Sequence, residues 1–271
     1  MNINFHIREN IDPDEFAALR EVCDENNDCY LISSRMDIEK NCLLIPRYAI
    51  HPYPGEYYAD VSKRTNNIIN SLDQYRFSSN IGIWQETVLS DMIKIDKRPY
   101  SCLDEGSYVI KGANLSKKFN WQTHMFAKTK ADVPIVVNRL LDIDEVSGYG
   151  LFIRPFTKLK KLCDGLNGLP VSNEWRFFAY KGKIFYETFY WASFQEAIPY
   201  HIPPIAAYNC AQSIINQVGN KSNFFSVDVG EKEEGGWIGI EINDGQQSGL
   251  CCAKPKTFYR NLIKEIRANE N

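Results

Sequence analysis

Apolar and polar residues alternate strictly in one segment near the C-terminus. Residues 237–245 read Trp-Ile-Gly-Ile-Glu-Ile-Asn-Asp-Gly. As a β-strand, this segment places its three isoleucines on one face and Gly239, Glu241 and Asn243 on the other. A face of glycine, glutamate and asparagine beside an isoleucine face is unlike ordinary solvent exposure. The pattern therefore predicts a strand whose polar face has a function.

Hydrophobic periodicity predicts the other elements as well. Asp12 and Pro13 supply the N-cap and the first position of a helix that runs to about residue 23. Residues 47–58, rich in Pro, Tyr and Gly, are predicted as an irregular loop. We expect strands at 30–33, 43–45, 108–112, 135–137, 151–154, 174–180, 183–191, 224–229 and 237–243, and further helices near 60–72 and at 116–130, 205–218 and 258–267.

Two strand pairings follow from this pattern. Lys181-Gly182 is a two-residue hairpin turn between residues 174–180 and 183–191, and its ladder places Arg176 directly opposite Glu187. If 224–229 pairs antiparallel with 237–243, one of two register parities puts Asp228 beside Gly239. Asp228 then lies diagonal to Glu241, within about 7 Å, and Gly239 leaves the space between them open.

Oxygen-bearing side chains on these strands suggest a cation site. Glu241 and Asn243 would lie about 7 Å apart on one face, and Asp228 would join them. Three such ligands suit one or two hard cations such as magnesium, which is usually shared with phosphate. The alternative is the polar outer face of a hairpin.

Three cationic residues also lie at or near strand ends. Lys111 ends an apolar strand before Gly112, where a lysine can reach a phosphate, although a solvated lysine is equally compatible. Arg154 ends another apolar strand, and Arg176 lies among aromatic residues. Arginines in such places need an anionic partner. That partner is phosphate or, for Arg176, Glu187. Lys118 is expected to be a solvated surface lysine.

Composition narrows the class of protein. The chain has 271 residues, enough for two or three compact units, and 44% hydrophobic with 24% charged residues is a globular composition. A net charge of -3 argues against a protein whose main task is to wrap nucleic acid. The eight cysteines form no Cys-x-x-Cys pair and no zinc pattern, and no signal core or 18-residue apolar run occurs. We expect a cytoplasmic, soluble protein with reduced thiols.

In order along the chain, these pieces resemble the ATP-grasp superfamily. The segment Glu174-Trp-Arg-Phe-Phe-Ala-Tyr-Lys-Gly-Lys resembles the Asp-x-Arg-x-Phe strand of ribosomal-protein glutamate ligases, and Ile240-Glu-Ile-Asn-Asp-Gly resembles their Glu-Val-Asn segment. The emphasis on two arginines and one lysine is most similar to the clade named after them, many of whose members come from phages and bacteria. The resemblance covers roughly residues 106–252.

The resemblance implies an α+β ATP-grasp fold, in which two subdomains (106–157 and 158–271) clasp ATP behind a small N-terminal α/β domain (1–105). It implies that Lys111 contacts the ATP phosphates and that Arg176 contacts the γ-phosphate or an acyl phosphate. The implied magnesium ligands are Asp228, Glu241 and Asn243. Arg154 is a further candidate catalytic residue, and the implied nucleotide-binding set near the adenine and hinge is Arg154, Pro155, Phe156, Thr157 and Glu174. The chain departs from the family pattern at two places. The hinge strand has an arginine and a proline, and the phosphate loop has a single glycine.

The implied activity is an ATP-dependent carboxylate–amine ligase that uses ATP and magnesium and forms an acyl phosphate. Its acceptor and donor stay open among small molecules, peptides and modified bases. No membrane partner is expected, and nucleic acid is a less favoured one. Two alternatives remain. A nucleic-acid ligase with a lysine–AMP intermediate would carry Lys-x-x-Gly, whereas Lys111 is followed by Gly-Ala-Asn. A non-catalytic nucleotide-binding module is the other.

Overall fold

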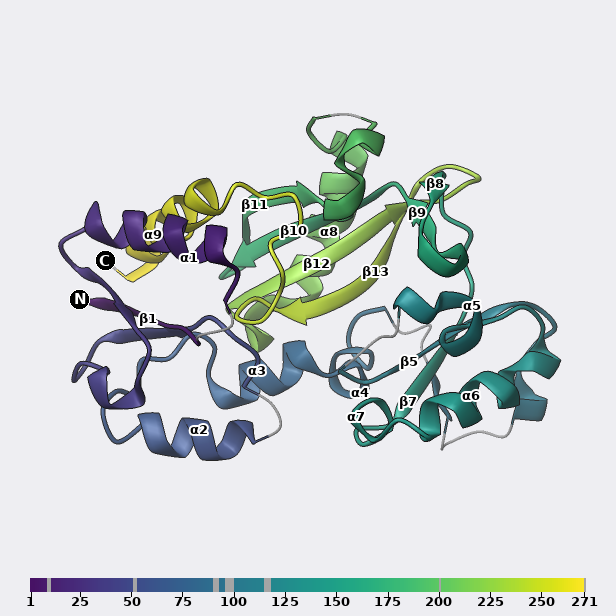
Figure 1. Cartoon of the computed structure of the whole chain (residues 1–271), viewed down its shortest axis with the longest axis horizontal. Coiled ribbons are helices and arrows are strands. Elements are labelled where there is room, and N and C mark those ends of the chain that lie inside the picture. Colours follow the sequence, from purple (N-terminus) through teal and green to yellow (C-terminus); the bar gives the residue numbers. More distant parts are fainter. Residues whose placement is uncertain are drawn as a thin grey trace.

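The structure is a computed structural model that describes residues 1–8, 11–50, 53–89, 93–95, 100–114, 118–199 and 201–270. Within them, an N-terminal parallel sheet, a small antiparallel sheet and a large antiparallel sheet succeed one another along the chain (Figure 1). Short 3-10 turns lie at Arg35–Asp37, Tyr100–Cys102, Lys118–Asn120, Lys130–Asp132, Leu166–Gly168, Ala192–Ala197 and Gly219–Lys221. No helix of the described part is both long and apolar enough to span a membrane.

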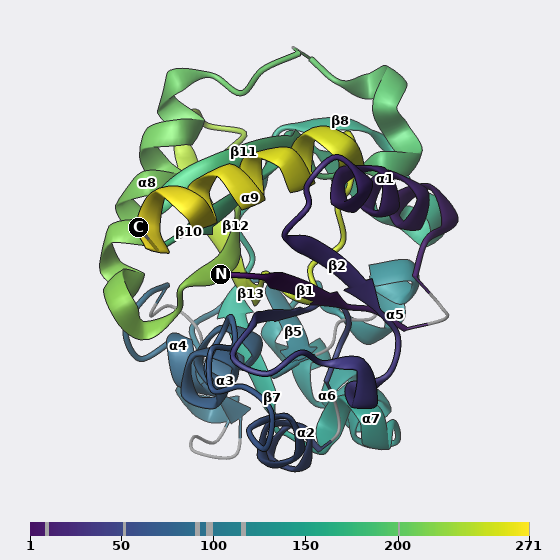
Figure 2. The ribbon, with the colours of Figure 1, turned by 90° about the vertical axis from the view of Figure 1, so that its left-hand side faces the viewer.

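The N-terminal sheet is parallel and has the order β2-β1-β3, with β1 at Ile3–His6, β2 at Cys29–Ile32 and β3 at Leu43–Pro46. Helix α1 (Pro13–Asp24) begins as predicted, because the Asp12 side chain accepts from the backbone N–H groups of Asp14 and Glu15. It lies beside the C-terminal helix α9 (Pro255–Glu270), as Figures 1 and 2 show. Apolar residues of α1, β1, α9 and the large sheet form one buried cluster. The two ends of the chain therefore share a core.

Three short helices connect this sheet to the rest: α2 (Pro54–Val61), α3 (Leu72–Ser79) and α4 (Ile81–Trp84). The predicted helix at 60–72 is wrong, because α2 ends at Val61 and α3 starts only at Leu72. Ser71 caps α3 in a capping box with Gln74, which explains that later start. The predicted loop at 47–58 is wrong over its second half, where Pro54 opens α2.

The small sheet has the order β4-β7-β5-β6. Its strands are β4 (Ile93–Lys94), β5 (Tyr108–Gly112), β6 (Phe126–Ala127) and β7 (Leu151–Pro155), and α6 (Val133–Leu141) packs on it beside α7 (Asp144–Ser147). The predicted strand at 135–137 is wrong, because it lies within α6. Val133, Val136, Val137 and Leu140 are buried at helical spacing, so packing overrides the β propensity of valine.

Residues 115–117, at the start of the predicted helix 116–130, lie outside the described residues. Over residues 118–130, the predicted helix is wrong. Only a 3-10 turn, the single turn α5 (Trp121–His124) and β6 occur there. The phosphate loop expected after Lys111 therefore leads into short elements and not into a long helix.

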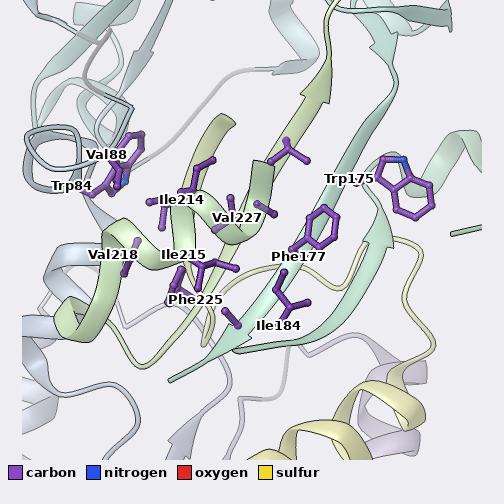
Figure 3. Packing of buried hydrophobic residues seen from close by; sticks show 14 of the residues in the cluster. Trp84, Val88, Trp175, Phe177, Ile184, Ile214, Ile215, Val218, Phe225 and Val227 are labelled. Atoms are coloured by element: carbon purple, nitrogen blue, oxygen red, sulfur yellow. The ribbon is translucent and has the colours of Figure 1, made fainter. Parts of the chain in front are cut away.

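The large sheet has the order β11-β10-β12-β13 and carries most of the candidate site. Its strands are β10 (Glu174–Tyr180), β11 (Lys183–Phe189), β12 (Phe224–Glu231) and β13 (Trp237–Asp244), and the two-stranded β8 (Lys161–Asp164) and β9 (Pro170–Ser172) adjoins it. Helix α8 (Ile205–Val218), at the predicted bounds, covers one face. Figure 3 shows the apolar cluster between α8 and the sheet, including Ile214, Phe177 and Val227.

Two β-bulges change the predicted registers. The hairpin turn forms as expected, with Lys181 at φ 45° and Gly182 at φ 83°. A register shift between Phe178 and Ala179 then places Arg176 opposite Thr188 and not Glu187. A second shift pairs Asp228 with Glu241, and Val229 with Gly239. The predicted pairing of Asp228 with Gly239 is therefore wrong, and the bulge leaves Ile240 of β13 without an opposite residue in β12.

The second bulge also changes which side chains share a face. A Cβ on Gly239 would lie 2.5 Å from Leu89 Cδ2 and 2.6 Å from Ile214 Cδ1, so this glycine faces α8. Ile238, Ile240 and Glu241 instead line a pocket on the opposite side. The open space expected at Gly239 is thus filled by apolar side chains, and the expected common face of Gly239 and Glu241 is wrong.

Candidate functional site

A pocket lies between the small sheet and the large sheet. Its walls come from β5, β7, the segment that follows β7, and β13. Most of the pocket lining is apolar and includes three aromatic side chains, Trp121, Phe156 and Trp191. The rings of Trp121 and Phe156 lie 6.1 Å apart. The other apolar residues of the lining are Val109, Met125, Pro155, Leu159, Leu169, Pro170, Ile238 and Ile240. A flat, largely apolar ring system suits such a space.

One end of the pocket is charged. Lys111 from β5 forms an ion pair with Glu241 from β13, with side chains only 9% and 13% exposed. Asn243 donates from Nδ2 to the second oxygen of Glu241 over 3.1 Å. Burial alone would raise the pKa of Glu241, but Lys111 and Lys118 together hold it well below its usual range. Glu241 is therefore a buried carboxylate that stays charged.

Arg176 and Asp228 form the second buried pair. Arg176 donates from Nε and Nη2 to the two oxygens of Asp228, each over 2.7 Å, and the side chains are 7% and 1% exposed. A third donor, Nη1, reaches the carbonyl of Gly249 over 3.0 Å. Glu187, the structural partner predicted for Arg176, is exposed and lies one register position away. The partner of Arg176 is Asp228, directly across the β10–β12 ladder.

Lys118 was missed by the sequence reasoning, which expected a solvated lysine. Its ammonium donates to the hydroxyl of Tyr190 and lies 4.2 Å from the centre of that ring. The Arg176 guanidinium lies 5.0 Å from the same ring. Burial would lower the pKa of Lys118, yet interactions with Tyr190, Glu241, Glu174 and Asp228 raise it. Neither the doublet Lys117-Lys118 nor Tyr190 carries a sequence signal that would have separated them from surface residues.

Glu174 lines the same pocket from the start of β10. Ser172 donates its hydroxyl to the carboxylate. Burial raises the pKa of Glu174 to about 7, although Lys118 and the Ser172 hydrogen bond oppose the rise. Burial therefore favours the protonated form of Glu174 compared with an exposed glutamate.

Arg154 lies at the end of β7, and residues 155–157 follow it along the pocket wall. Its guanidinium donates from Nη1 to the carbonyl of Ile240 over 3.0 Å and from Nη2 to that of Gly239 over 3.5 Å. Both acceptors belong to β13. The structure thus brings Arg154 to the pocket, where these hydrogen bonds reach backbone oxygens of the opposite sheet.

The predicted site residues converge in this region. The pocket lining contains Lys111, Arg154, Pro155, Phe156, Thr157, Glu174 and Glu241. Asn243 lines a smaller adjoining pocket together with Lys111 and Glu241. Asp228 and Glu241 face each other across neighbouring strands. In the described ranges, no three His, Cys, Asp or Glu side chains gather as a metal site. The candidate metal set is two carboxylates and one amide, and the nitrogen atoms of Lys111 and Arg176 now contact the carboxylate oxygens that a divalent cation would take.

Comparisons with known proteins identify the family and the fold of the chain. A family model matches residues 94–262, and it describes an ATP-grasp domain of family 3 in the clade named for two arginines and one lysine. No curated protein matches the sequence.

Among solved structures, D-cycloserine synthetase DcsG superimposes with a TM-score of 0.62 at 10% identity, covering 98% of this chain and 100% of that one. D-alanine–D-alanine ligase from Bacillus anthracis, complexed with ATP, gives a TM-score of 0.62 at 12% identity, covering 100% and 98%. A RimK domain ATP-grasp protein from Sphaerobacter thermophilus gives 0.58 at 12% identity, covering 94% and 98%. The predicted ATP-grasp fold is confirmed, and the chain belongs to the ATP-grasp superfamily, in family 3 of the clade named for two arginines and one lysine.

Proposed function

We propose that this ATP-grasp enzyme joins a carboxylate to an amine at the expense of ATP, through an acyl-phosphate intermediate. The observation that carries the proposal is a cluster of buried charges beside an apolar pocket. Lys111, Lys118 and Glu241 line the pocket. The buried pair of Arg176 and Asp228 adjoins them, since Asp228 lies opposite Glu241 and Arg176 shares the Tyr190 ring with Lys118. In this proposal, residues 106–157 and 158–271 are the two subdomains that enclose the nucleotide. Residues 1–105 form the preceding domain.

The apolar part of the pocket suits adenosine. Phe156 and Trp121 offer aromatic surfaces, and Ile238 and Ile240 close the opposite wall. The segment 154–157 supplies backbone groups at the pocket edge, where an adenine can be read by hydrogen bonds. An ATP complex of the structurally similar D-alanine–D-alanine ligase supports placing ATP in this fold.

The charged end of the pocket suits the phosphates. Phosphoryl transfer spreads negative charge over the transferring group, so catalysis rests mainly on positioning and on cations. Lys111 and Lys118 lie where they can contact the phosphate chain, and Arg176 lies where it can contact the γ-phosphate or the acyl phosphate. Lys118 and Arg176 both lie within cation–π distance of the Tyr190 ring, which helps to position the two cations.

Asp228, Glu241 and Asn243 would hold magnesium. The fit rests on the donor set, since all three offer oxygen and both carboxylates already lie against cations in this structure. When bound, magnesium would offset charge on the phosphate oxygens. Lys111 and Arg176 would then be released to contact phosphate in place of the carboxylates.

The chemistry needs no side-chain nucleophile. A substrate carboxylate oxygen attacks the γ-phosphorus and ADP leaves, which gives the acyl phosphate. An amine nitrogen then attacks the acyl carbon, phosphate leaves, and the nitrogen loses a proton. The protein positions the reactants and excludes water.

The test compares Glu241→Gln with Glu234→Gln, a matched change at an exposed glutamate of the β12–β13 connector. Wild-type protein, ATP, magnesium and a panel of carboxylates are incubated with hydroxylamine, which traps acyl phosphates as hydroxamates. We expect ATP-dependent hydroxamate and ADP in wild type and Glu234→Gln. The yield should fall by ~100-fold or more in folded Glu241→Gln, since even the loss of a residue that only supports a metal ligand costs roughly 10–100-fold.

Three outcomes contradict the proposal or part of it. Full activity in Glu241→Gln removes the metal assignment. An AMP adduct on Lys111, seen by mass spectrometry, indicates a nucleotidyltransferase. If ATP with magnesium neither binds nor raises the melting temperature, the ligase proposal fails and a non-catalytic binding module is the better explanation.

A further inference from the structure

At the bulge in β13, on the edge of the large sheet, the backbone carbonyl groups of Gly239 and Ile240 accept hydrogen bonds from outside this sheet. Val229 pairs with Gly239 and Asp228 with Glu241, so the β12–β13 register passes over Ile240. In a regular strand, successive carbonyls point to opposite edges, and the extra residue of a bulge breaks this alternation. In the sheet order, β13 is an outer strand, so its carbonyls that point away from β12 meet no further strand of the described part.

Arg154 satisfies both of these carbonyls. Its two terminal nitrogens donate to Ile240 and Gly239, and the side chain belongs to β7 of the other sheet. A guanidinium carries its donors in a planar fork and stays charged, so it suits two adjacent acceptors. The residue that follows Ile240 is Glu241, the carboxylate at the charged end of the pocket.

A second tie joins the same two sheets, the ion pair of Lys111 and Glu241. Lys111 and Arg154 lie on the neighbouring strands β5 and β7. The Lys111 tie uses a carboxylate that the proposed magnesium would bind, so it would be released when phosphate and metal bind. The Arg154 tie uses backbone oxygens next to that carboxylate, for which the ligands proposed here do not compete. It would therefore persist in the loaded enzyme.

We infer that Arg154 is a positioning residue that anchors the β13 bulge to the small sheet and so aims Glu241 at the phosphate end of the pocket. This inference rests on the proposed function for what Glu241 does. It gives Arg154 a role on the protein backbone in place of the phosphate contact expected for a catalytic arginine. It also links closure of the ATP pocket to the placement of a proposed metal ligand.

The first test is hydrogen exchange of the ligand-free protein, which needs no nucleotide. Arg154→Met should speed exchange of the backbone amides in residues 238–242 roughly tenfold or more, the size expected from losing charge-assisted hydrogen bonds. Arg154→Lys, which donates from a single nitrogen, should give a smaller increase. Arg139→Met is the matched control. Arg139 lies on α6 and also donates to a backbone carbonyl, that of Thr123. It should leave exchange of residues 238–242 unchanged.

The second test measures affinity for adenosine, AMP, ADP and ATP without magnesium. Tryptophan fluorescence can report binding, since Trp121 and Trp191 line the pocket. An anchor of β13 predicts that Arg154→Met weakens all four ligands by a similar factor. In the presence of ATP, it also predicts a higher magnesium concentration for half-maximal ADP formation.

Two results overturn the inference. One is unchanged exchange of residues 238–242 in Arg154→Met. The other is a loss of affinity that grows with each added phosphate and is restored by Arg154→Lys, which identifies a phosphate ligand. If wild-type protein binds none of the four ligands, the proposed function fails, while the exchange experiment still decides the role of Arg154.

Discussion

Replacing either member of the buried Arg176–Asp228 pair should destabilise the protein far more than replacing both. The two side chains are 7% and 1% exposed and share two hydrogen bonds of 2.7 Å. Arg176→Met or Asp228→Leu leaves the other charge buried without its partner. Such a change costs ~3–5 kcal/mol in the free energy of unfolding.

The double variant Arg176→Met/Asp228→Leu removes both charges and fills the space with apolar side chains. Pairs replaced in this way are often close to neutral in stability. Here the carbonyl of Gly249 also loses its donor, which costs ~1–3 kcal/mol. We therefore expect the double variant to lie ~1–3 kcal/mol below wild type, whereas additive single losses would total ~6–10 kcal/mol.

Thermal unfolding followed by circular dichroism measures these differences. At roughly 2–4 °C per kcal/mol for a protein of this size, each single variant should melt ~6–20 °C below wild type. The exposed pair of Lys158 and Glu233 provides the control, and Glu233→Gln should change stability by less than ~1 kcal/mol. Additive losses, or a single variant as stable as wild type, would refute the reasoning that the pair is buried and mutually dependent.

Two further stability predictions concern packing and pH. Gly239→Ala brings a Cβ within 2.5 Å of Leu89 and 2.6 Å of Ile214, and should lower the free energy of unfolding by ~1–3 kcal/mol, measured by thermal unfolding. In the control Gly55→Ala, the nearest atom lies 3.9 Å away, so this change should not destabilise the protein. Equal stability of the two variants would contradict the close approach at Gly239. Burial lowers the pKa of His6 from 6.5 to about 4, so between these values the unfolded chain binds a proton that the folded protein does not. The stability of wild type should therefore fall by up to ~3 kcal/mol as pH decreases from 6.5 to 4, and His6→Gln should be flatter over this window; parallel pH profiles of the two proteins contradict this account.

Local sequence signals predicted several elements well. Asp12 and Pro13 mark the start of α1, Lys181 and Gly182 form the hairpin turn, and the helix at 205–218 has its predicted bounds. Each rests on interactions within a few residues. Errors arose where tertiary contacts compete with propensity, as in the valine-rich segment 135–137, which packs as a helix on the small sheet.

The predicted site shows the same division. The residue types that make up the charged end of the pocket were identified in the sequence because charged residues on apolar strands need partners. Their partners were not identified. Arg176 was expected beside Glu187 and is bound to Asp228, and Lys118 was expected in solvent and lies over Tyr190. Choice of partner depends on strand order and on bulges, which no local pattern encodes.

The sequence alone determined the identities, the order and the strand locations of Lys111, Arg176, Asp228 and Glu241, and through them the family. Only the tertiary structure decided how they pair. One inserted residue in β13 moves Glu241 opposite Asp228, turns Gly239 toward α8 and presents two carbonyls to Arg154. The physical reason is that side chains alternate with a period of two along a strand, so a shift of one residue exchanges the faces of everything beyond it.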